Sequence, residues 1–378
     1  MAFSFRNLYR FTWRWLASIR WTPRRALIVV AYFIVVPLLE LVIWACLLLD
    51  RLLFSRYRQQ TIEEPVFIIG NFRSGTTFLH RLLAGDRNRF STMKMWEILF
   101  APSVTQRRVI AALAAVDRKL GHPVPRLLRW IESYWQDANV MHEVSLAQPE
   151  EDEYLCLHIW SALTIGLSSG LLDEARPYAW FDHVLPAGDR KRIMNFYADC
   201  VRRHLFDRDA GNGLQYLAKN PALTPKIGSA LEQFPDAKVI YLVRNPLEAI
   251  PSFVSMMKFS WEVMGADVED SALADFVTEM AGHWYRYPLE RLATAPADSY
   301  QIVVYDDLVS DPARVVRDIY AHFGYAIDAD FEQLLAAVSG EARSYRSRHD
   351  YDLESLGLDR DRLVEEFADV IERFGFES

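Results

Sequence analysis

The residues best suited to chemistry in this chain follow a short apolar run. After PVFIIG at 65–70, the sequence continues N-F-R-S-G-T-T through residue 77. Gly70 and Gly75 allow the backbone to turn tightly and to approach an anion. Arg73 adds a fork of hydrogen-bond donors. Three hydroxyl residues complete the loop: Ser74, Thr76 and Thr77. The pattern predicts a cradle for phosphate oxygens between a strand and the start of a helix.

The loop has the spacing of a nucleotide-binding P-loop, but one residue departs from that motif. GxxxxGK[ST] requires lysine at position 76, and this chain has Thr76. Because that lysine reaches the outer phosphates of a nucleoside triphosphate, its absence argues against an ordinary ATPase. Two alternatives stay open on the residues alone: a P-loop nucleotide kinase or ATPase, and a non-catalytic membrane-bound adaptor that kept a nucleotide-binding fold.

A second anion-binding motif lies in FPDAKVIYLVRNPLEAIPSF at 234–253. Arg244 leaves the end of a predicted strand and can hold a phosphate through two parallel hydrogen bonds. Ser252 stands about two turns along the helix that follows and can donate its hydroxyl. The chain therefore offers two separate sites for phosphate groups, each at the junction of a strand and a helix.

Together and in this order, the two motifs resemble those of sulfotransferases that use 3′-phosphoadenosine 5′-phosphosulfate (PAPS). The resemblance extends patchily over roughly 65–350 and is greatest to bacterial membrane-associated members that act on lipids or carbohydrates. It implies a PAPS donor, in-line transfer of a sulfonate group to an acceptor hydroxyl, and no metal. It assigns the 3′-phosphate to Arg244 and Ser252. It assigns the 5′-phosphate to the first loop, namely Arg73, Ser74, Gly75, Thr76 and Thr77, with Arg73 where the family often has lysine.

The resemblance also implies roles for basic residues outside the two motifs. Lys219, in YLAKNP, matches the family's second basic residue, which contacts the sulfonate. Family members close the adenosine end of the donor with a late basic loop. The corresponding segment, ARSYRSRHDYDL, holds Arg343, Arg346, Arg348 and His349. We expect Arg346 and Arg348 to contact the 3′-phosphate beside Arg244.

The general base is the part of the site that the sequence defines least. Cytosolic members use a histidine two residues after the second lysine, and Pro221 occupies that position here. Carbohydrate and tyrosyl members use a glutamate beyond the phosphate loop, where this chain has Glu97 in MKMWEIL. We predict Glu97 as the base, because a carboxylate near the donor can take a hydroxyl proton. The alternative is an acidic cluster further along: His142, Glu143, Glu150, Glu151, Asp152 and Glu153.

A parallel sheet is needed to position these motifs. Continuous apolar runs predict three buried strands, at 65–70, 237–243 and 300–305, each followed by a helix. This order predicts an α/β, P-loop-like three-layer fold with a central, mostly parallel sheet. We expect 91–214 to form a large helical insert over the sheet edge. The catalytic domain is predicted to cover 61–378.

Residues 1–60 form the second predicted unit, a basic and aromatic arm followed by a membrane anchor. The first 25 residues contain six arginines and no acid, although the whole chain of 378 residues has a net charge of −8. Residues 26–49 are apolar apart from Glu40 and are long enough to span a bilayer core of about 30 Å. Pro37 and the basic flanks favour a re-entrant hairpin or shallow anchor with both flanks in the cytoplasm. A straight span is the alternative.

Composition narrows the possible functions. The chain is 51% hydrophobic, which excludes a disordered protein, and its net negative charge argues against nucleic-acid binding. Its three cysteines lack metal-ligand spacing, and no N-x-[ST] glycosylation site is present. These features favour a bacterial inner-membrane enzyme with a cytoplasmic catalytic domain over a Golgi-type lumenal one. We therefore predict a membrane-attached, PAPS-dependent sulfotransferase with an alcohol acceptor of lipid or carbohydrate type.

Overall fold

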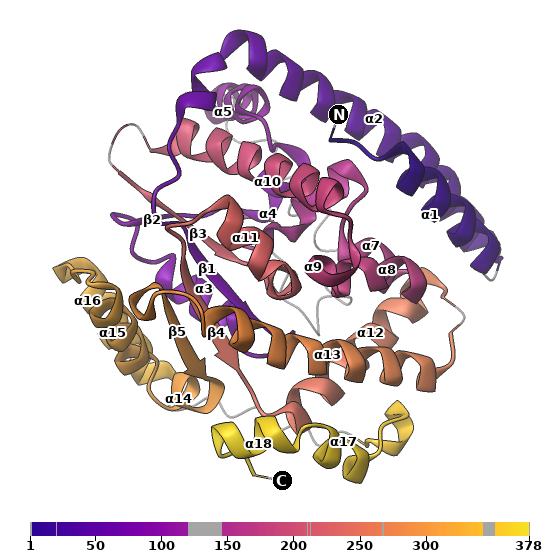
Figure 1. The fold of residues 1–378 in the computed structure, drawn as a ribbon. Coiled ribbons are helices and arrows are strands. Elements are labelled where there is room, and N and C mark those ends of the chain that lie inside the picture. The colour runs from indigo at the N-terminus through magenta and orange to yellow at the C-terminus, as the bar shows by residue number, and fades with distance from the viewer. Residues whose placement is uncertain are drawn as a thin grey trace.

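Five parallel strands form the central sheet of the described chain (Figure 1). The computed structural model describes residues 2–19, 21–119, 146–209, 211, 213–266, 268–342 and 352–377. The strand order is β2-β3-β1-β4-β5. Their bounds are β1 Val66–Gly70, β2 Phe90–Ser91, β3 Gln215–Lys219, β4 Lys238–Val243 and β5 Tyr300–Val304. The predicted α/β, P-loop-like three-layer fold is confirmed, and every strand pair in the described sheet is parallel.

Helices cover both faces of the sheet because successive side chains of each strand point to opposite faces. In β1, Val66 and Ile68 pack with one helical layer, and Phe67 and Ile69 pack with the other. The first layer contains α3 (Thr76–Leu83), α15 (Pro312–Phe323) and α16 (Ala329–Ala342). The second contains α10 (Ala187–Arg208), α11 (Ile227–Gln233), α12 (Pro246–Met264) and α13 (Asp270–Leu292) (Figure 1).

The three predicted strands are present as β1, β4 and β5, but the sequence analysis missed β3. Its five residues are all buried between β1 and β2. Gln215 and Lys219 at its two ends break the continuous apolar run by which a buried strand is recognised. The predicted strand pattern was therefore incomplete at the point where Lys219 enters the site.

The stretch between β2 and β3 is largely helical where the structure describes it. It begins with α4 (Met95–Phe100) and α5 (Val104–Lys119). After 120–145, which lie outside the described residues, the 3₁₀ segment η3 runs over Asp152–Ile159. Three short helices then lead into α10: α7 (Leu163–Ser168), α8 (Leu172–Ala179) and α9 (Phe181–Val184).

The N-terminal segment forms two helices that lie side by side along the insert (Figure 1). They are α1 (Phe5–Ser18) and α2 (Pro23–Leu53). The chain runs through Pro37 as one helix, so the bend expected for a re-entrant hairpin is not formed. Pro37 removes one backbone donor from the helix, which a long helix tolerates. Helix α2 is long and apolar enough to cross a membrane, and its most apolar 18-residue stretch is only 11% buried.

The C-terminal part completes the molecule beyond the sheet. Helix α14 (Tyr305–Ser310) follows β5 directly, and α17 (Arg360–Glu366) and α18 (Ala368–Phe374) pack against the second layer. The Asn245 side chain donates to the Glu377 carbonyl at 2.8 Å, so the end of the described chain lies next to the Arg244 loop.

Candidate active site at the ends of the parallel strands

The loop after β1 adopts backbone conformations that its residue types permit. Gly70 has φ of 148°, and a side chain there would collide with the Leu242 carbonyl of β4. Gly75 has φ of 86°, and a Cβ would lie 2.8 Å from the Tyr305 ring. Arg73 itself is left-handed, with φ of 65°, a conformation that costs free energy for a non-glycine residue and is found more often at functional sites. The loop is thus held in a specific tight form at the carboxyl edge of the sheet.

Side chains of the loop and of the segment that follows β3 stabilise this backbone conformation. The Ser74 hydroxyl is fully buried and donates to the Asn71 carbonyl at 2.7 Å. The Thr224 hydroxyl donates to the Gly70 carbonyl and accepts from the Gly70 N–H, both at 3.0 Å. Thr76 and Thr77 begin α3, where the first backbone N–H groups of a helix lack intrahelical partners and suit an anion. Ser74 therefore shapes the predicted cradle, and Thr76 and Thr77 supply its helix N-terminus.

Arg73 and the second motif meet across the sheet edge. The Arg73 Nε–H donates to the Ser252 Oγ at 3.0 Å, and an Arg244 Nη1–H donates to the Arg73 carbonyl at 2.9 Å. Parallel strands make this meeting possible, because β1 pairs with β4 and both end at the same edge. The structure thus brings together three of the predicted donor-binding residues, which are 171 and 179 positions apart in sequence.

The Arg244 side chain is held in one orientation by its neighbours. Its Nε and Nη2 groups donate to one oxygen of Glu248, at 3.0 and 2.8 Å. Its guanidinium carbon lies 4.3 Å from the centre of the Tyr305 ring, which is a cation–π contact. The Tyr285 hydroxyl donates to the Arg244 carbonyl at 2.7 Å. Glu248 and Tyr305 were not selected from the sequence. The four-residue spacing of Arg244 and Glu248 at the start of α12 is the sequence signal that could have identified Glu248.

Lys219 ends β3 beside the same edge and is fully buried. Its Nζ donates to Glu150 Oε1 at 2.8 Å and to Glu151 Oε1 at 2.9 Å. The two carboxylates are only 10% and 17% exposed. A lysine ammonium has three N–H donors, so within the described part of the chain one remains for another acceptor. Two members of the acidic cluster that was the alternative source of the base, Glu150 and Glu151, therefore lie against Lys219.

The next two acids of the cluster, Asp152 and Glu153, make buried contacts within the fold. Asp152 accepts hydrogen bonds from Tyr197, Tyr216 and Asn220, at 2.5, 2.8 and 2.8 Å. Burial raises the pKa of the Asp152 carboxyl to about 6, although these hydrogen bonds oppose the change. Glu153 pairs with Lys226 at 2.5 Å, and burial raises the pKa of the Glu153 carboxyl as well. Both acids hold the start of η3 against β3 and the chain after it.

Glu97 lies elsewhere in the insert. It occupies the first turn of α4 and is 1% exposed. One carboxylate oxygen accepts from the Lys94 N–H at 2.8 Å in an N-terminal capping box, and the other pairs with Arg208 at the end of α10. Among the described residues, no contact joins Glu97 to Lys219 or to the loop after β1. The assignment of Glu97 as the base stays a prediction, and its surroundings are those of a helix cap.

Several predicted residues fall outside the described chain: His142, Glu143, Arg343, Arg346, Arg348 and His349. The proposed contact of Arg346 and Arg348 with a 3′-phosphate stays a prediction. Within the described residues, no group of three or more His, Cys, Asp or Glu side chains is arranged to hold a metal ion.

The fold is a parallel α/β sheet of the P-loop type, with threonine in place of the P-loop lysine and with two arginines and a serine brought together at the ends of its strands. Comparison with known proteins identifies the family. A profile of the sulfotransferase family matches residues 65–329, and the chain belongs to that family. It is 27% identical over 355 residues to the omega-hydroxy-beta-dihydromenaquinone-9 sulfotransferase Stf3 of Mycobacterium tuberculosis and of Mycobacterium bovis. Those alignments cover 88% of this chain and 81% of each relative.

Solved structures show the same fold. Sulfotransferase STF1 from Mycobacterium tuberculosis superposes with a TM-score of 0.68 at 19% identity, over 88% of this chain and 83% of that one. Sulfotransferase STF9 from Mycobacterium avium superposes with a TM-score of 0.70 at 18% identity, over 88% of this chain and 82% of that one. The two alignments extend over most of each chain and include more than the sheet.

Proposed function

We propose that this sulfotransferase transfers the sulfonate group of PAPS to the hydroxyl of an amphiphilic alcohol at the cytoplasmic face of a bacterial inner membrane. One observation carries the proposal of the donor. Arg73, Arg244 and Ser252 come from two segments that are distant in sequence and meet through the contacts at 3.0 and 2.9 Å described above. PAPS carries its two phosphates on the 3′ and 5′ oxygens of one ribose, so the cationic groups that bind them must lie close together.

In this proposal each of the two segments binds one phosphate end of the donor. The N–H groups at the start of α3, together with Arg73, hold the 5′-phosphosulfate. Arg244 and Ser252 hold the 3′-phosphate, for which Glu248 and Tyr305 keep the Arg244 guanidinium in place. When the donor enters, its phosphate oxygens replace the Ser252 and carbonyl oxygens as acceptors for these arginines.

The transfer step needs a base on one side of the sulfur and cations on the other. The acceptor oxygen forms a bond to sulfur while the bond from sulfur to the bridging oxygen breaks. The electron pair stays on the 5′-phosphate, and 3′,5′-adenosine bisphosphate leaves. Lys219 and Arg73 stabilise the charge on the sulfonate and leaving oxygens, as preorganised cations do in a buried site. The proton of the acceptor hydroxyl passes to a carboxylate.

We assign that carboxylate to the pair Glu150 and Glu151. Both contact Lys219, the residue expected to touch the sulfonate, so an acceptor hydroxyl that reaches the sulfonate also reaches the pair. Glu97 has both of its carboxylate oxygens engaged by Lys94 and Arg208. The assignment therefore favours the alternative that the sequence analysis left open.

The acceptor class rests on two supports. The curated relatives named above act, by their names, on a hydroxylated menaquinone derivative, which is an amphiphilic alcohol. This chain also has a long apolar helix at its N-terminus that can keep the enzyme at a membrane. We infer a long-chain lipid alcohol as the acceptor, with the donor taken from the cytoplasm.

Calorimetric titration of the detergent-solubilised protein tests the donor site. We expect micromolar binding of 3′,5′-adenosine bisphosphate that magnesium does not change and that Arg244→Ala abolishes. Arg314→Ala, which removes an exposed arginine of α15 that pairs with the exposed acids Asp307 and Asp318, is the matched control and should bind as the unaltered protein does. Preference for ATP–magnesium would instead indicate a kinase or ATPase, and absence of binding would indicate a non-catalytic adaptor. Either result refutes the proposal.

A further inference from the structure

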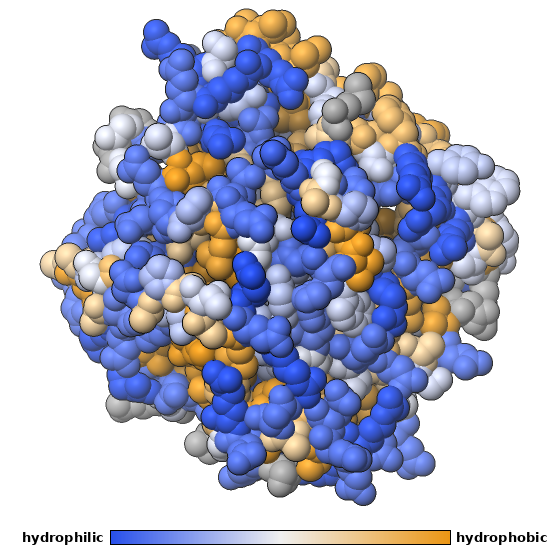
Figure 2. All heavy atoms as spheres, in the orientation of Figure 1, coloured by the Kyte–Doolittle hydropathy of each residue, from blue (hydrophilic) through white to orange (hydrophobic). Residues whose placement is uncertain are grey.

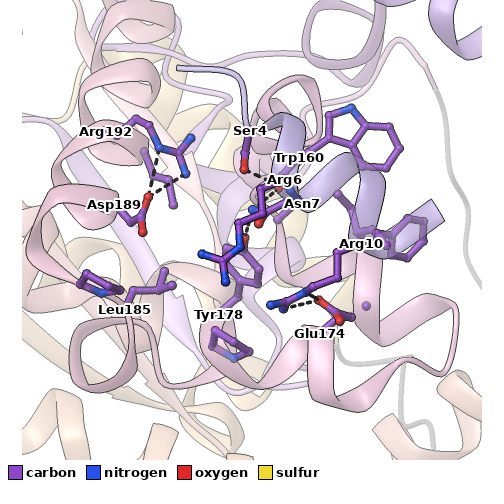
Figure 3. A pocket seen from close by; sticks show the side chains of 17 residues that line it. Ser4, Arg6, Asn7, Arg10, Trp160, Glu174, Tyr178, Leu185, Asp189 and Arg192 are labelled. Atoms are coloured by element: carbon purple, nitrogen blue, oxygen red, sulfur yellow. Dashed lines mark hydrogen bonds and ion pairs between the residues drawn. The ribbon is translucent and has the colours of Figure 1, made fainter. Parts of the chain in front are cut away.

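Helix α1 is bound to the catalytic domain by polar contacts along most of its length (Figure 3). The Asn7 side chain donates to the Trp160 carbonyl and to the Tyr178 hydroxyl, both at 2.8 Å. Arg10 Nε donates to Glu174 of α8 at 2.8 Å, and Arg14 also pairs with Glu174, at 2.9 Å. The N–H of Ser4 donates to the Ile159 carbonyl. These arginines of the basic arm therefore face an acid of the same chain, and α1 is bound to the catalytic domain.

The C-terminal half of helix α2 is bound to the same domain by polar contacts. Glu40 pairs with His158 Nδ1 at 2.9 Å, and the Trp44 indole N–H donates to the His158 carbonyl at 3.2 Å. Asp50 is fully buried and pairs with Arg203 of α10 at 3.0 Å. Asp50 also accepts the N–H groups of Val104 and Thr105 at 2.9 and 2.8 Å, which caps α5.

These attachments restrict how α2 can meet a bilayer. Both its preceding helix and its C-terminal end are bound to the catalytic domain, so both flanks lie on one side of any membrane. A helix that crosses the bilayer once has its ends on opposite sides. A hairpin would return to the same side, but residues 23–53 form one helix. A straight helix with both ends on one side must lie along the membrane surface.

The outward side of α2 is suited to lie in lipid. Its solvent-facing positions form an apolar stripe along most of the helix, and apolar side chains gather along the edge of the molecule where Figure 1 places α2 (Figure 2). Large exposed members of the stripe are Leu27, Ile34, Leu38, Leu41, Val42, Leu48, Leu49 and Leu52. Aromatic residues of α1 and of the following turn are exposed beside it, as is usual at the headgroup level: Phe5, Tyr9, Trp13 and Trp21.

We propose that α1 and α2 together form a monotopic membrane seat, with α2 lying in the plane of a single leaflet and the catalytic domain above it. Three arginines near the end of α2 are exposed and suit anionic headgroups: Arg51, Arg56 and Arg58. A cavity of about 1440 Å³ opens between α1, α2 and α10. Its lining includes the exposed side chains of Trp13, Phe33 and Leu48, so a lipid chain can enter it directly from the leaflet. The seat does not depend on which reaction the enzyme catalyses.

Labelling of single cysteines tests the topology. In full-length protein with Cys46→Ser, Cys156 and Cys200 are buried, so an added cysteine is the reactive one. We expect a membrane-impermeant maleimide to label both Arg6→Cys and Ser55→Cys when the protein is bound to sealed vesicles. Protection of Arg6→Cys until detergent is added, with Ser55→Cys labelled, would show that α2 crosses the bilayer and would overturn the proposal.

The depth of the helix separates a flat seat from a hairpin. A fluorophore on Leu38→Cys lies beside Pro37, where a hairpin would reach deepest, and one on Leu52→Cys lies near the helix end. We expect lipids with a nitroxide close to the headgroup to quench both fluorophores equally. Quenching of the Leu38→Cys label only by nitroxides near the bilayer centre would refute a helix in the membrane plane.

A matched pair of valines tests which surface faces the lipid. Val42 of α2 and Val184 of α9 are 53% and 52% exposed. On vesicles of phosphatidylcholine and phosphatidylglycerol, we expect Val42→Gln to lower the partition coefficient about tenfold, because half of a valine side chain leaves the leaflet and an amide enters it. Val184→Gln should leave partitioning unchanged. Equal effects of the two substitutions would contradict the proposed seat. Bisphosphate binding should be the same in both variants, which shows that each is folded.

Discussion

The most informative set of substitutions tests whether the general base is one of the carboxylates that contact Lys219 or the carboxylate that caps α4. Glu150→Gln and Glu151→Gln each keep the shape of the side chain and an oxygen for Lys219 Nζ, which lies 2.8 and 2.9 Å away. An amide cannot accept a proton from the acceptor hydroxyl. Loss of a positioned general base lowers kcat by about 10²–10⁴-fold, which corresponds to about 3–5 kcal/mol of transition-state stabilisation. We expect at least one of the two variants to show a loss of this size.

Glu97→Gln is the matched control because it makes the same chemical change at another buried glutamate. The amide can still accept either the Lys94 N–H or a hydrogen bond from Arg208, but the charge that both donors face is lost. A weakened cap and a lost charged hydrogen bond cost about 1–2 kcal/mol of unfolding free energy. Because Arg208 is 45% exposed, solvent screens its share of that loss. We expect kcat to change less than about threefold.

The assay follows transfer of labelled sulfonate from PAPS to a long-chain alcohol that the unaltered enzyme accepts, with kcat and KM measured separately. Loss of the base should lower kcat and leave the affinity for the bisphosphate unchanged. Urea denaturation measures stability in parallel. The reasoning is refuted if Glu97→Gln lowers kcat a hundredfold with stability and bisphosphate affinity intact, or if neither variant beside Lys219 loses more than tenfold.

Three further predictions concern the scaffold. Asp50→Ala should lower the unfolding free energy by about 3–5 kcal/mol in urea, because buried Arg203 loses a counter-ion and α5 loses its cap; a loss below about 1 kcal/mol would contradict this. Gly75→Ala should reduce bisphosphate affinity at least about tenfold by calorimetry, since a Cβ at φ of 86° would press on Tyr305; unchanged affinity would show that the loop relaxes freely. Burial raises the pKa of Asp152 to about 6 from 3.8, so the folded state binds the proton more tightly and stability falls as pH rises between these values. Relative to Asp152→Asn, the unaltered protein should lose about 2–3 kcal/mol between pH 4 and pH 7, and parallel stability curves would contradict the assignment.

The parts of the fold that could be predicted are those in which burial leaves a continuous apolar run. Strands β1, β4 and β5 are such runs and were located within a residue or two. Strand β2 has only two residues, and β3 carries a polar residue at each end, so neither has a recognisable pattern. The placement of β3 between β1 and β2 depends on packing between segments more than a hundred residues apart, which local periodicity does not record.

The candidate site likewise has parts that the sequence predicts and parts that only the fold reveals. The loop after β1 and the Arg244–Ser252 segment are contiguous motifs, so residue type and spacing were enough to predict their chemistry. The contact of Lys219 with Glu150 and Glu151 joins positions 69 and 68 residues apart. From the sequence alone, acids after a proline are typical of a solvated helix start. Their burial against a lysine could be found only when the fold brought β3 beside them.

The sequence of α2 contains a pattern of acidic and apolar positions that its length and mean hydropathy do not reveal. A buried carboxylate without a partner is costly, so each acid in an apolar helix implies a protein group that pairs with it. Glu40, Ile43, Leu47 and Asp50 fall within an arc of about 80° on a helix with 3.6 residues per turn. All four face the catalytic domain, where His158 and Arg203 meet the two acids. The large side chains of the apolar stripe, from Leu27 to Leu52, are all uncharged. A helix with its acids on one stripe and apolar residues on the opposite side has protein against one face and lipid against the other, which a helix surrounded by lipid has no reason to show.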